Sequence, residues 1–244
     1  MDAFGVVDLL FEASTAANAA ILGMTDAGPT DRPGQYGLDV AADDAAVAML
    51  VDQGMSVMSE ESGLTEGKSA LMALLDPIDG STNAYRGIPF YSTSICVFDE
   101  EGPWIGTVLS HGTGQRFHAV RGMGAWRDGA SIHPSPCQSI EVSVVGLSGL
   151  VSAQVGSWQH RTLGCASLEF CGVADGSLDA YVLGSGISLR PWDYLAGLLI
   201  CVEAGAAIAE LDRKDPWVTT AAERRPIAAA TPQLLSTILA ATMA

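Results

Sequence analysis

Basic side chains are scarce in this chain of 244 residues. It has 12 lysines and arginines against 28 aspartates and glutamates, which gives a formal net charge of −16 at pH 7. Nucleic acids and anionic membranes bind proteins through concentrated positive charge, and the nearest thing to a basic patch is the pair Arg224 and Arg225. The composition therefore argues against a nucleic-acid or membrane partner. An acidic protein that acts on a phosphate would also need cations to bring the two together.

Paired cysteines and long apolar runs are missing as well. No CxxC pair occurs, and scattered thiols are typical of reduced, buried cysteines in a cytoplasmic protein. The five cysteines are Cys96, Cys137, Cys165, Cys171 and Cys201. No run reaches the roughly 20 apolar residues of a membrane span, and the N-terminus carries Asp2, Asp8 and Glu12 without the basic start of a signal peptide. We therefore expect a cytoplasmic protein.

What the chain does contain is a mixture of helical and strand patterns without an internal repeat. Hydrophobic residues make up 48% of it, enough for a sizeable core. Periodicity predicts helices at 2–24, 43–53, 167–176, 193–204 and 232–241. Strands are predicted at 57–60, 91–98, 104–111, 115–120, 124–127, 140–147, 178–183 and 227–230, with a late hairpin made by Leu211 and 217–220. The linker-like 133–136 suggests an N-terminal α+β lobe, 1–136, and a C-terminal α/β lobe, 137–244.

The segment 76–83, with the sequence DPIDGSTN, carries the most chemistry. Asp76 and Asp79 would point to opposite faces of a regular strand, but Pro77 fixes its φ and bends the chain, so both carboxylates can reach one side. The carbonyl of Ile78 then becomes a candidate third oxygen ligand, and Mg²⁺ prefers such an all-oxygen set. The glycine and hydroxyl residues that follow can present free backbone N–H groups to a phosphate.

Two further acidic motifs flank this segment. Ser59-Glu60-Glu61-Ser62-Gly63 follows a predicted strand, and Pro191-Trp192-Asp193 precedes a long apolar helix. An aspartate before a helix is usually an N-cap, and in this company Asp193 is also a candidate metal ligand. Glu61 is either a supporting or a merely solvated residue.

Taken together, these motifs resemble those of the inositol monophosphatase family, within the fructose-1,6-bisphosphatase-like superfamily. The string 76–83 resembles the family signature, Glu60-Glu61-Ser62-Gly63 its upstream Glu-Glu motif, and Trp192-Asp193 with Glu203-Ala204-Gly205 its downstream motif. The resemblance covers about residues 35 to 230 and implies an α/β fold, the layered αβαβα sandwich of that superfamily. It also implies a magnesium-dependent phosphatase, lithium inhibition and a homodimer.

The resemblance assigns a metal role to each acidic motif. It implies that Glu60, Asp76 and the carbonyl of Ile78 hold the Mg²⁺ that activates water, which makes Glu60 a catalytic residue. Asp76, Asp79 and Asp193 would hold a second Mg²⁺ facing the leaving-group oxygen. A third, weaker Mg²⁺ near Glu60 is typical of the family, so two to three ions per site are expected.

The phosphate and the attacking water have expected partners too. The backbone at Gly80 and Ser81, followed by Thr82, would bind the phosphate, and the Ser81 hydroxyl would orient the water. Asp43 resembles the aspartate of the family's Val-Thr-x-x-Asp element and would polarise that hydroxyl, although Ala41 replaces the threonine.

The substrate itself is less clearly marked. Inositol-cleaving members have a glutamate about seven residues before the Trp-Asp aspartate, and Gly186 stands there in this chain. Ser185, Ser188 and Arg190 could supply other contacts, and Arg190 could meet a second anionic group or be a surface charge. Cys165 lies in a segment that resembles the family's leaving-group helix start. We expect a small phosphorylated metabolite, either a polyol or sugar-like phosphate or histidinol phosphate.

Two other classes remain as alternatives. An aspartyl-phosphate mechanism of the haloacid dehalogenase type needs DxDG(S/T), whereas two residues separate the aspartates here. A metal-binding regulatory module would not need the adjacent phosphate-binding string, and no EF-hand loop is present. The four histidines have no ligand spacing, and we expect them at the surface or in turns.

Overall fold

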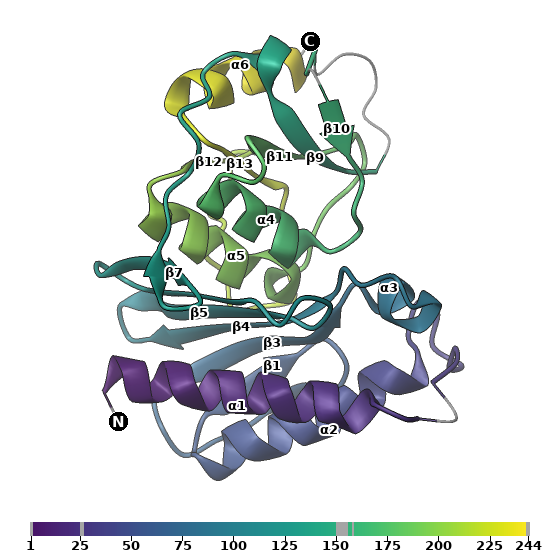
Figure 1. Cartoon of the computed structure of the whole chain (residues 1–244). Coiled ribbons are helices and arrows are strands. Elements are labelled where there is room, and N and C mark those ends of the chain that lie inside the picture. The colour runs from purple at the N-terminus through teal and green to yellow at the C-terminus, as the bar shows by residue number, and fades with distance from the viewer. Residues whose placement is uncertain (1, 25–26, 150–155, 158, 243–244) are drawn as a thin grey trace.

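The computed structural model describes residues 2–24, 27–149, 156–157 and 159–242. Figure 1 shows five stacked layers that alternate between helices and sheets, beginning and ending with helices. The layered αβαβα sandwich expected from the sequence is therefore the observed fold.

The first layer consists of α1 (Ala3–Ile21) and α2 (Gly37–Asp52), which pack against each other and on the first sheet. The carboxylate of Asp2 caps α1 by accepting a hydrogen bond from the Gly5 amide at 2.8 Å. By length and composition alone, α1 could cross a membrane. In the structure its inner face packs into the core, with Leu10, Ala13 and Ala17 fully buried.

The second layer is an eight-stranded sheet in the order β2-β1-β3-β4-β5-β6-β7-β8. Its strands are β1 (Ser56–Ser59), β2 (Gly63–Thr65), β3 (Met72–Asp79), β4 (Ser92–Asp99), β5 (Gly102–Ser110), β6 (Arg116–Val120), β7 (Gly124–Arg127) and β8 (Ala130–Ser131). All its pairings are antiparallel except that of β1 with β3. In that pair Ser59 lies beside Leu75, so the residues that follow, Glu60 and Asp76, come to the same edge of the sheet.

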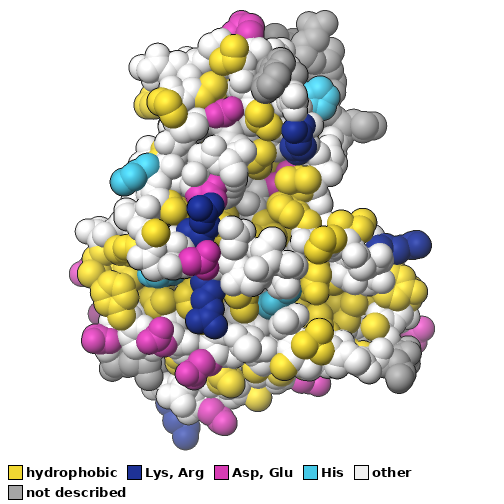
Figure 2. All heavy atoms as spheres, viewed as in Figure 1, with side chains coloured by type: hydrophobic (Ala, Val, Ile, Leu, Met, Phe, Trp, Pro, Cys, Tyr) yellow, Lys and Arg dark blue, Asp and Glu magenta, His cyan; other side chains and the backbone are white. Residues whose placement is uncertain are grey.

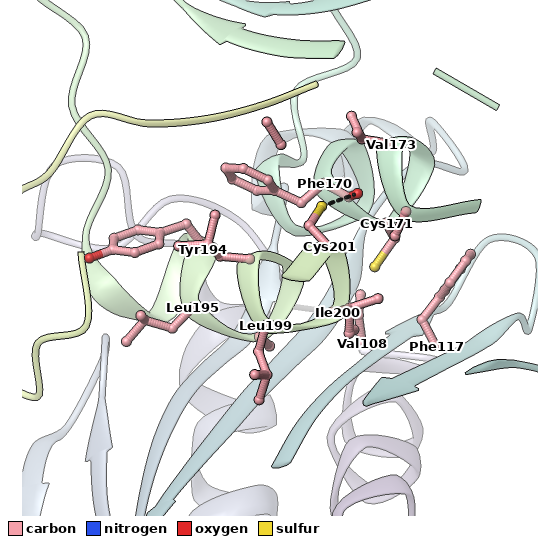
Figure 3. Close-up of a cluster of buried hydrophobic side chains, with 14 of the residues drawn as sticks. Val108, Phe117, Phe170, Cys171, Val173, Tyr194, Leu195, Leu199, Ile200 and Cys201 are labelled. Atoms are coloured by element: carbon pink, nitrogen blue, oxygen red, sulfur yellow. Dashed lines mark hydrogen bonds between the residues drawn. The ribbon is translucent and has the colours of Figure 1, made fainter. Parts of the chain in front are cut away.

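The third layer contains α4 (Ala166–Asp175) and α5 (Pro191–Ala204), which pack against each other. Figure 3 shows their shared core, where Phe170 of α4 and Cys201 of α5 meet and Val108 and Phe117 of the first sheet lie below. The Cys201 thiol donates to the Phe170 carbonyl at 3.1 Å. This packing fixes where α5 begins, and with it the position of Asp193.

The fourth and fifth layers close the molecule. A five-stranded sheet has the order β10-β9-β11-β13-β12, and α6 covers its outer face (Figure 1). The elements are β9 (Val144–Ser148), β10 (Gln159–Arg161), β11 (Ala180–Leu183), β12 (Ala207–Glu210), β13 (Pro226–Ala229) and α6 (Pro232–Thr242). The chain passes from one sheet to the other between Ser131 and Val144, around the expected lobe boundary.

Three sequence predictions differ from the structure. α2 begins at Gly37, six residues before the predicted start, because the Asp39 carboxylate caps the helix by accepting a hydrogen bond from the Tyr36 amide at 2.8 Å. The predicted strand 140–147 opens with a short 3-10 turn, Ile140–Val142. The predicted hairpin of Leu211 with 217–220 is wrong: β12 pairs with β13, and 211–225 forms the connection between them.

On the face shown in Figure 2, Lys and Arg side chains are few and stand apart from one another. The basic side chains visible there form no continuous patch, in keeping with the composition of the chain.

Candidate metal and phosphate site

The bend at 76–79 takes the form of an irregularity in the β3–β4 pairing. Asp76 pairs with Ser94 and Asp79 with Ser92, so β3 has one more residue than β4 in this stretch. Such a bulge re-aims side chains at the end of a strand. The Thr93 hydroxyl supports the bend by donating to the Pro77 carbonyl at 2.7 Å.

The structure brings Glu60, Asp76 and Asp193 together. One carboxylate oxygen from each lies within 4.8 Å of the others. Glu60 comes from the turn after β1, Asp76 from β3, and Asp193 from the first turn of α5. Asp193 also caps α5, because its Oδ2 accepts a hydrogen bond from the Arg190 amide at 2.8 Å. Three segments that are far apart in sequence thus meet as one acidic cluster.

Asp79 lies beside this cluster but directs one oxygen elsewhere. Its Oδ2 accepts hydrogen bonds from the Ser167 amide at 2.7 Å, the Ser167 hydroxyl at 2.6 Å and the Cys165 thiol at 3.1 Å. These donors stand at the first turn of α4, whose N-cap is Cys165. Asp79 therefore joins the first sheet to α4, and it is not among the three carboxylates whose oxygens lie within 4.8 Å of one another.

Burial and mutual repulsion make this cluster costly without a cation. Desolvation, followed by the charges of Glu61 and Asp79, raises the pKa of Glu60 to about 7. Desolvation and the charge of Glu60 raise the pKa of Asp76 and of Asp193 well above the ordinary range. Hard carboxylate oxygens grouped in this way fit a divalent cation such as Mg²⁺. The residues present therefore suit the metal that the sequence implies.

The expected phosphate loop begins at Gly80, which caps the short helix α3 (Ser81–Arg86) in a left-handed conformation, φ 88°. A Cβ at this position would stand 3.0 Å from the Gly164 carbonyl and 3.2 Å from that of Phe90, so only glycine fits without strain. The Ser81 hydroxyl donates to the Ile78 carbonyl at 3.2 Å. Thr82 shares a hydrogen bond with the Tyr36 hydroxyl at 3.2 Å.

The structure corrects the expected partner of Asp43. Asp43 accepts a hydrogen bond from the Ser59 hydroxyl, and the described residues show no contact between Asp43 and Ser81. Asp39, one turn earlier on α2, stands next to Ser81. Burial raises the pKa of Asp39 to about 7, against the hydrogen bond that its Oδ2 accepts from the Tyr36 amide at 2.8 Å, which lowers it. Asp39 Oδ1 is buried without a hydrogen-bond partner.

Sequence reasoning missed Asp39 because the resemblance to the family's Val-Thr-x-x-Asp element pointed to Asp43, one turn later on α2. The available signal was the i, i+4 spacing, which puts both aspartates on one face of a helix. The packing of α2 then decides which of them meets Ser81 and which meets Ser59.

Sequence reasoning also missed the part played by the segment before α2. Arg32 pairs with the Glu61 carboxylate at 3.1 Å and donates to the Glu60 carbonyl at 3.2 Å. Gln35 also donates to Glu61. Glu61 is thus the anchor that holds this segment against the turn carrying Glu60.

His111 lies in the turn that follows β5, as expected, and is partly buried there. It bonds to the Thr93 hydroxyl at 2.8 Å, and burial lowers its pKa to about 4. Since the single Thr93 proton goes to Pro77, Nε2 of His111 is the donor. His111 therefore supports the bend of β3 as a neutral residue.

The candidate substrate contacts are spread around the acidic cluster. Cys165 is buried, and its thiol donates a hydrogen bond to the Asp79 carboxylate. Its side chain is therefore closed to substrate. Ser185 lies in an exposed turn between β11 and α5. Arg190 forms an ion pair with Glu223 at 3.0 Å, next to Asp193. The structure thus brings Arg190, and not Ser185, into contact with Asp193.

Known proteins are similar to this chain in sequence and in fold. The sequence model of the inositol monophosphatase family matches residues 38–244. The chain belongs to this family of phosphatases. This agrees with the family resemblance of the three acidic motifs.

Its relatives include archaeal sugar phosphatases. A fructose-1,6-bisphosphatase of Pyrococcus furiosus is 33% identical over 208 residues, covering 83% of this chain and 81% of that protein. A fructose-1,6-bisphosphatase/inositol-1-monophosphatase of Archaeoglobus fulgidus is 34% identical over 178 residues, covering 71% and 69%. Among solved structures, a hypothetical protein of Pyrococcus horikoshii with similarities to inositol-1 monophosphatase superposes with a TM-score of 0.87 at 28% identity, covering 98% of both chains.

Proposed function

We propose that this chain is a Mg²⁺-dependent phosphomonoesterase that hydrolyses a small polyol or sugar-like phosphate such as an inositol monophosphate. The observation that carries the proposal is the convergence of Glu60, Asp76 and Asp193 within 4.8 Å, at the edge of the sheet where β3 leads into Gly80 and Ser81. Asp79 through Oδ1 and the carbonyl of Ile78 would complete the set of metal ligands. When bound, Mg²⁺ supplies positive charge for the phosphoryl oxygens and lowers the pKa of water.

The chain's own groups would orient the reaction. The first N–H groups of a helix have no partner within it, so the amides at the start of α3 are free to bind a phosphate oxygen. The Ser81 hydroxyl lies between the Ile78 carbonyl and Asp39 and would hold the attacking water. Asp39 would take the proton of that water, since a pKa of about 7 suits a general base near neutral pH.

Other features of the proposal rest on the family. We place the active site between the two lobes, 1–136 and 137–244, because Asp193 of the second meets Glu60 of the first. We further propose a cytoplasmic homodimer that is inhibited by lithium and binds two to three Mg²⁺ per site.

Release of inorganic phosphate from a panel of substrates tests the proposal. The panel contains inositol 1-phosphate, histidinol phosphate and fructose 1,6-bisphosphate, the last because relatives carry that name. We expect Mg²⁺-dependent release that EDTA abolishes, and a fall of two or more orders of magnitude in Asp193→Asn and Glu60→Gln. Full activity in either variant, or activity independent of divalent metal, would disprove the assigned ligands. Histidinol phosphate as the best substrate would replace the polyol assignment within the same chemistry.

A further inference from the structure

Arg190 lies next to Asp193, and its guanidinium already forms an ion pair. Its backbone amide donates a hydrogen bond to the Asp193 carboxylate at 2.8 Å. The same guanidinium pairs with Glu223 at 3.0 Å and donates to the Ala221 carbonyl at 2.5 Å. A second phosphate on the substrate would have to compete with Glu223 for this cation.

Glu223 is held in place by more than Arg190. Its second oxygen accepts a hydrogen bond from the Ser188 hydroxyl at 2.7 Å. The backbones of Leu189 and Arg224 form an antiparallel bridge, with hydrogen bonds of 2.8 and 2.9 Å between them. The segment before α5 and the segment before β13 are therefore joined, and Glu223 has two side-chain partners there.

Both members of the pair remain accessible. The Arg190 side chain is 45% exposed and that of Glu223 53% exposed. An exposed ion pair contributes little to stability, typically below about 1 kcal/mol, so its removal should leave the fold intact. Its position next to Asp193 makes it a neutral polar surface where the leaving group of a bound ester would lie. Such a surface suits hydroxyl groups, while a second phosphate would have to displace the Glu223 carboxylate from Arg190.

We propose that Glu223 is a specificity-determining residue that occupies Arg190 and so directs the enzyme to monophosphates with hydroxylated leaving groups. This inference rests on the proposed phosphatase function. It assigns the role of positioning residue to Glu223 and that of leaving-group contact to Arg190. Arg190 lies in the same connection from β11 to α5 as Gly186, which replaces the family's glutamate, whereas Glu223 comes from the connection between β12 and β13.

The test compares kcat and KM for inositol 1-phosphate and fructose 1,6-bisphosphate in the full chain with Mg²⁺. In Glu223→Gln, which keeps a partner for Ser188 but removes the charge, we expect kcat/KM for the bisphosphate to rise about tenfold relative to the monophosphate. One charge-assisted hydrogen bond contributes about this much. The change should lie in KM, with kcat within about twofold. Adding Arg190→Ala to Glu223→Gln should abolish the gain.

Glu101→Gln is the matched control, because Glu101 also forms an exposed pair with an arginine, Arg121 at 3.0 Å, in the turns that follow β4 and β6 of the first sheet. In this variant the ratio of kcat/KM for the bisphosphate to kcat/KM for the monophosphate should equal that of the wild type. An unchanged ratio in Glu223→Gln, or a gain that survives Arg190→Ala, overturns the inference while leaving the phosphatase intact. Absence of activity on every ester in the wild type would instead overturn the proposed function, and the inference with it.

Discussion

Asp39 and Asp43 stand one turn apart on α2, yet the structure gives them different partners. Asp39 lies next to Ser81, and Asp43 accepts the hydroxyl proton of Ser59. Burial raises the pKa of both carboxyls, that of Asp39 to about 7. In the proposed mechanism Asp39 is therefore the residue that acts on water through Ser81, whereas Asp43 secures the end of β1 to α2.

This difference predicts a split between activity and stability. Asp39→Asn should lower kcat by about 100-fold, in the range of a lost general base, because an amide cannot take the proton. The melting temperature should hardly change, since Asn still caps α2. Steady-state kinetics and thermal unfolding measure the two effects.

Asp43→Ala is the control on the same helix face. It removes the acceptor of the Ser59 hydroxyl, so it should reduce the melting temperature and lower kcat less than Asp39→Asn does. The reverse order of the two kcat values would return the role to Asp43 and remove Asp39 from the mechanism.

At the scale of elements, the short helix α3 is capped at each end by a glycine. Both glycines have a left-handed backbone conformation. Gly80 has φ 88° and Gly87 φ 73°. Either position costs about 1–2 kcal/mol for a residue with a Cβ. The surroundings differ, since a Cβ on Gly80 would crowd two carbonyls, while one on Gly87 would meet nothing within 4 Å.

Gly80→Ala should therefore destabilise the protein clearly more than Gly87→Ala, because crowding adds to the backbone strain. It should also raise KM or abolish activity, since the phosphate loop must shift. Gly87→Ala should retain activity. Denaturant unfolding and phosphate release decide the matter, and equal losses in the two variants would show that the Gly80 loop is not confined as described.

The same scale shows why part of the molecule could be predicted and part could not. The DPID string and the parallel pairing of β1 with β3 are local, so the convergence of Glu60 and Asp76 followed from the sequence once the family was recognised. The 211–225 connection has apolar residues that suggest a strand, and only the pairing of β12 with β13 excludes it. Glu223 in that connection could not be placed beside Arg190 from spacing alone, because it lies 33 positions further along the chain, with α5 and β12 in between.

At the scale of the whole molecule, a net charge of −16 and a buried carboxylate cluster both favour the binding of a divalent cation. Without metal, the folded protein holds protons on Glu60 and its neighbours that the unfolded chain would release at neutral pH. Their stabilising contribution is complete below the ordinary carboxyl pKa of 4.5 and is lost as the pH rises toward about 7. Mg²⁺ binds the deprotonated carboxylates, so it should compensate for this loss where the loss is largest.

The central claim is that the cluster of Glu60, Asp76 and Asp193 holds Mg²⁺, and the melting temperature with and without Mg²⁺ tests it most directly. In EDTA, stability should fall between pH 5 and pH 8. Saturating Mg²⁺ should raise the melting temperature by several degrees at pH 8 and by much less at pH 5. Asp193→Asn, which keeps the cap on α5, should lose most of this gain. A gain that is absent, or that is equal at both pH values and undiminished in Asp193→Asn, would contradict the claim.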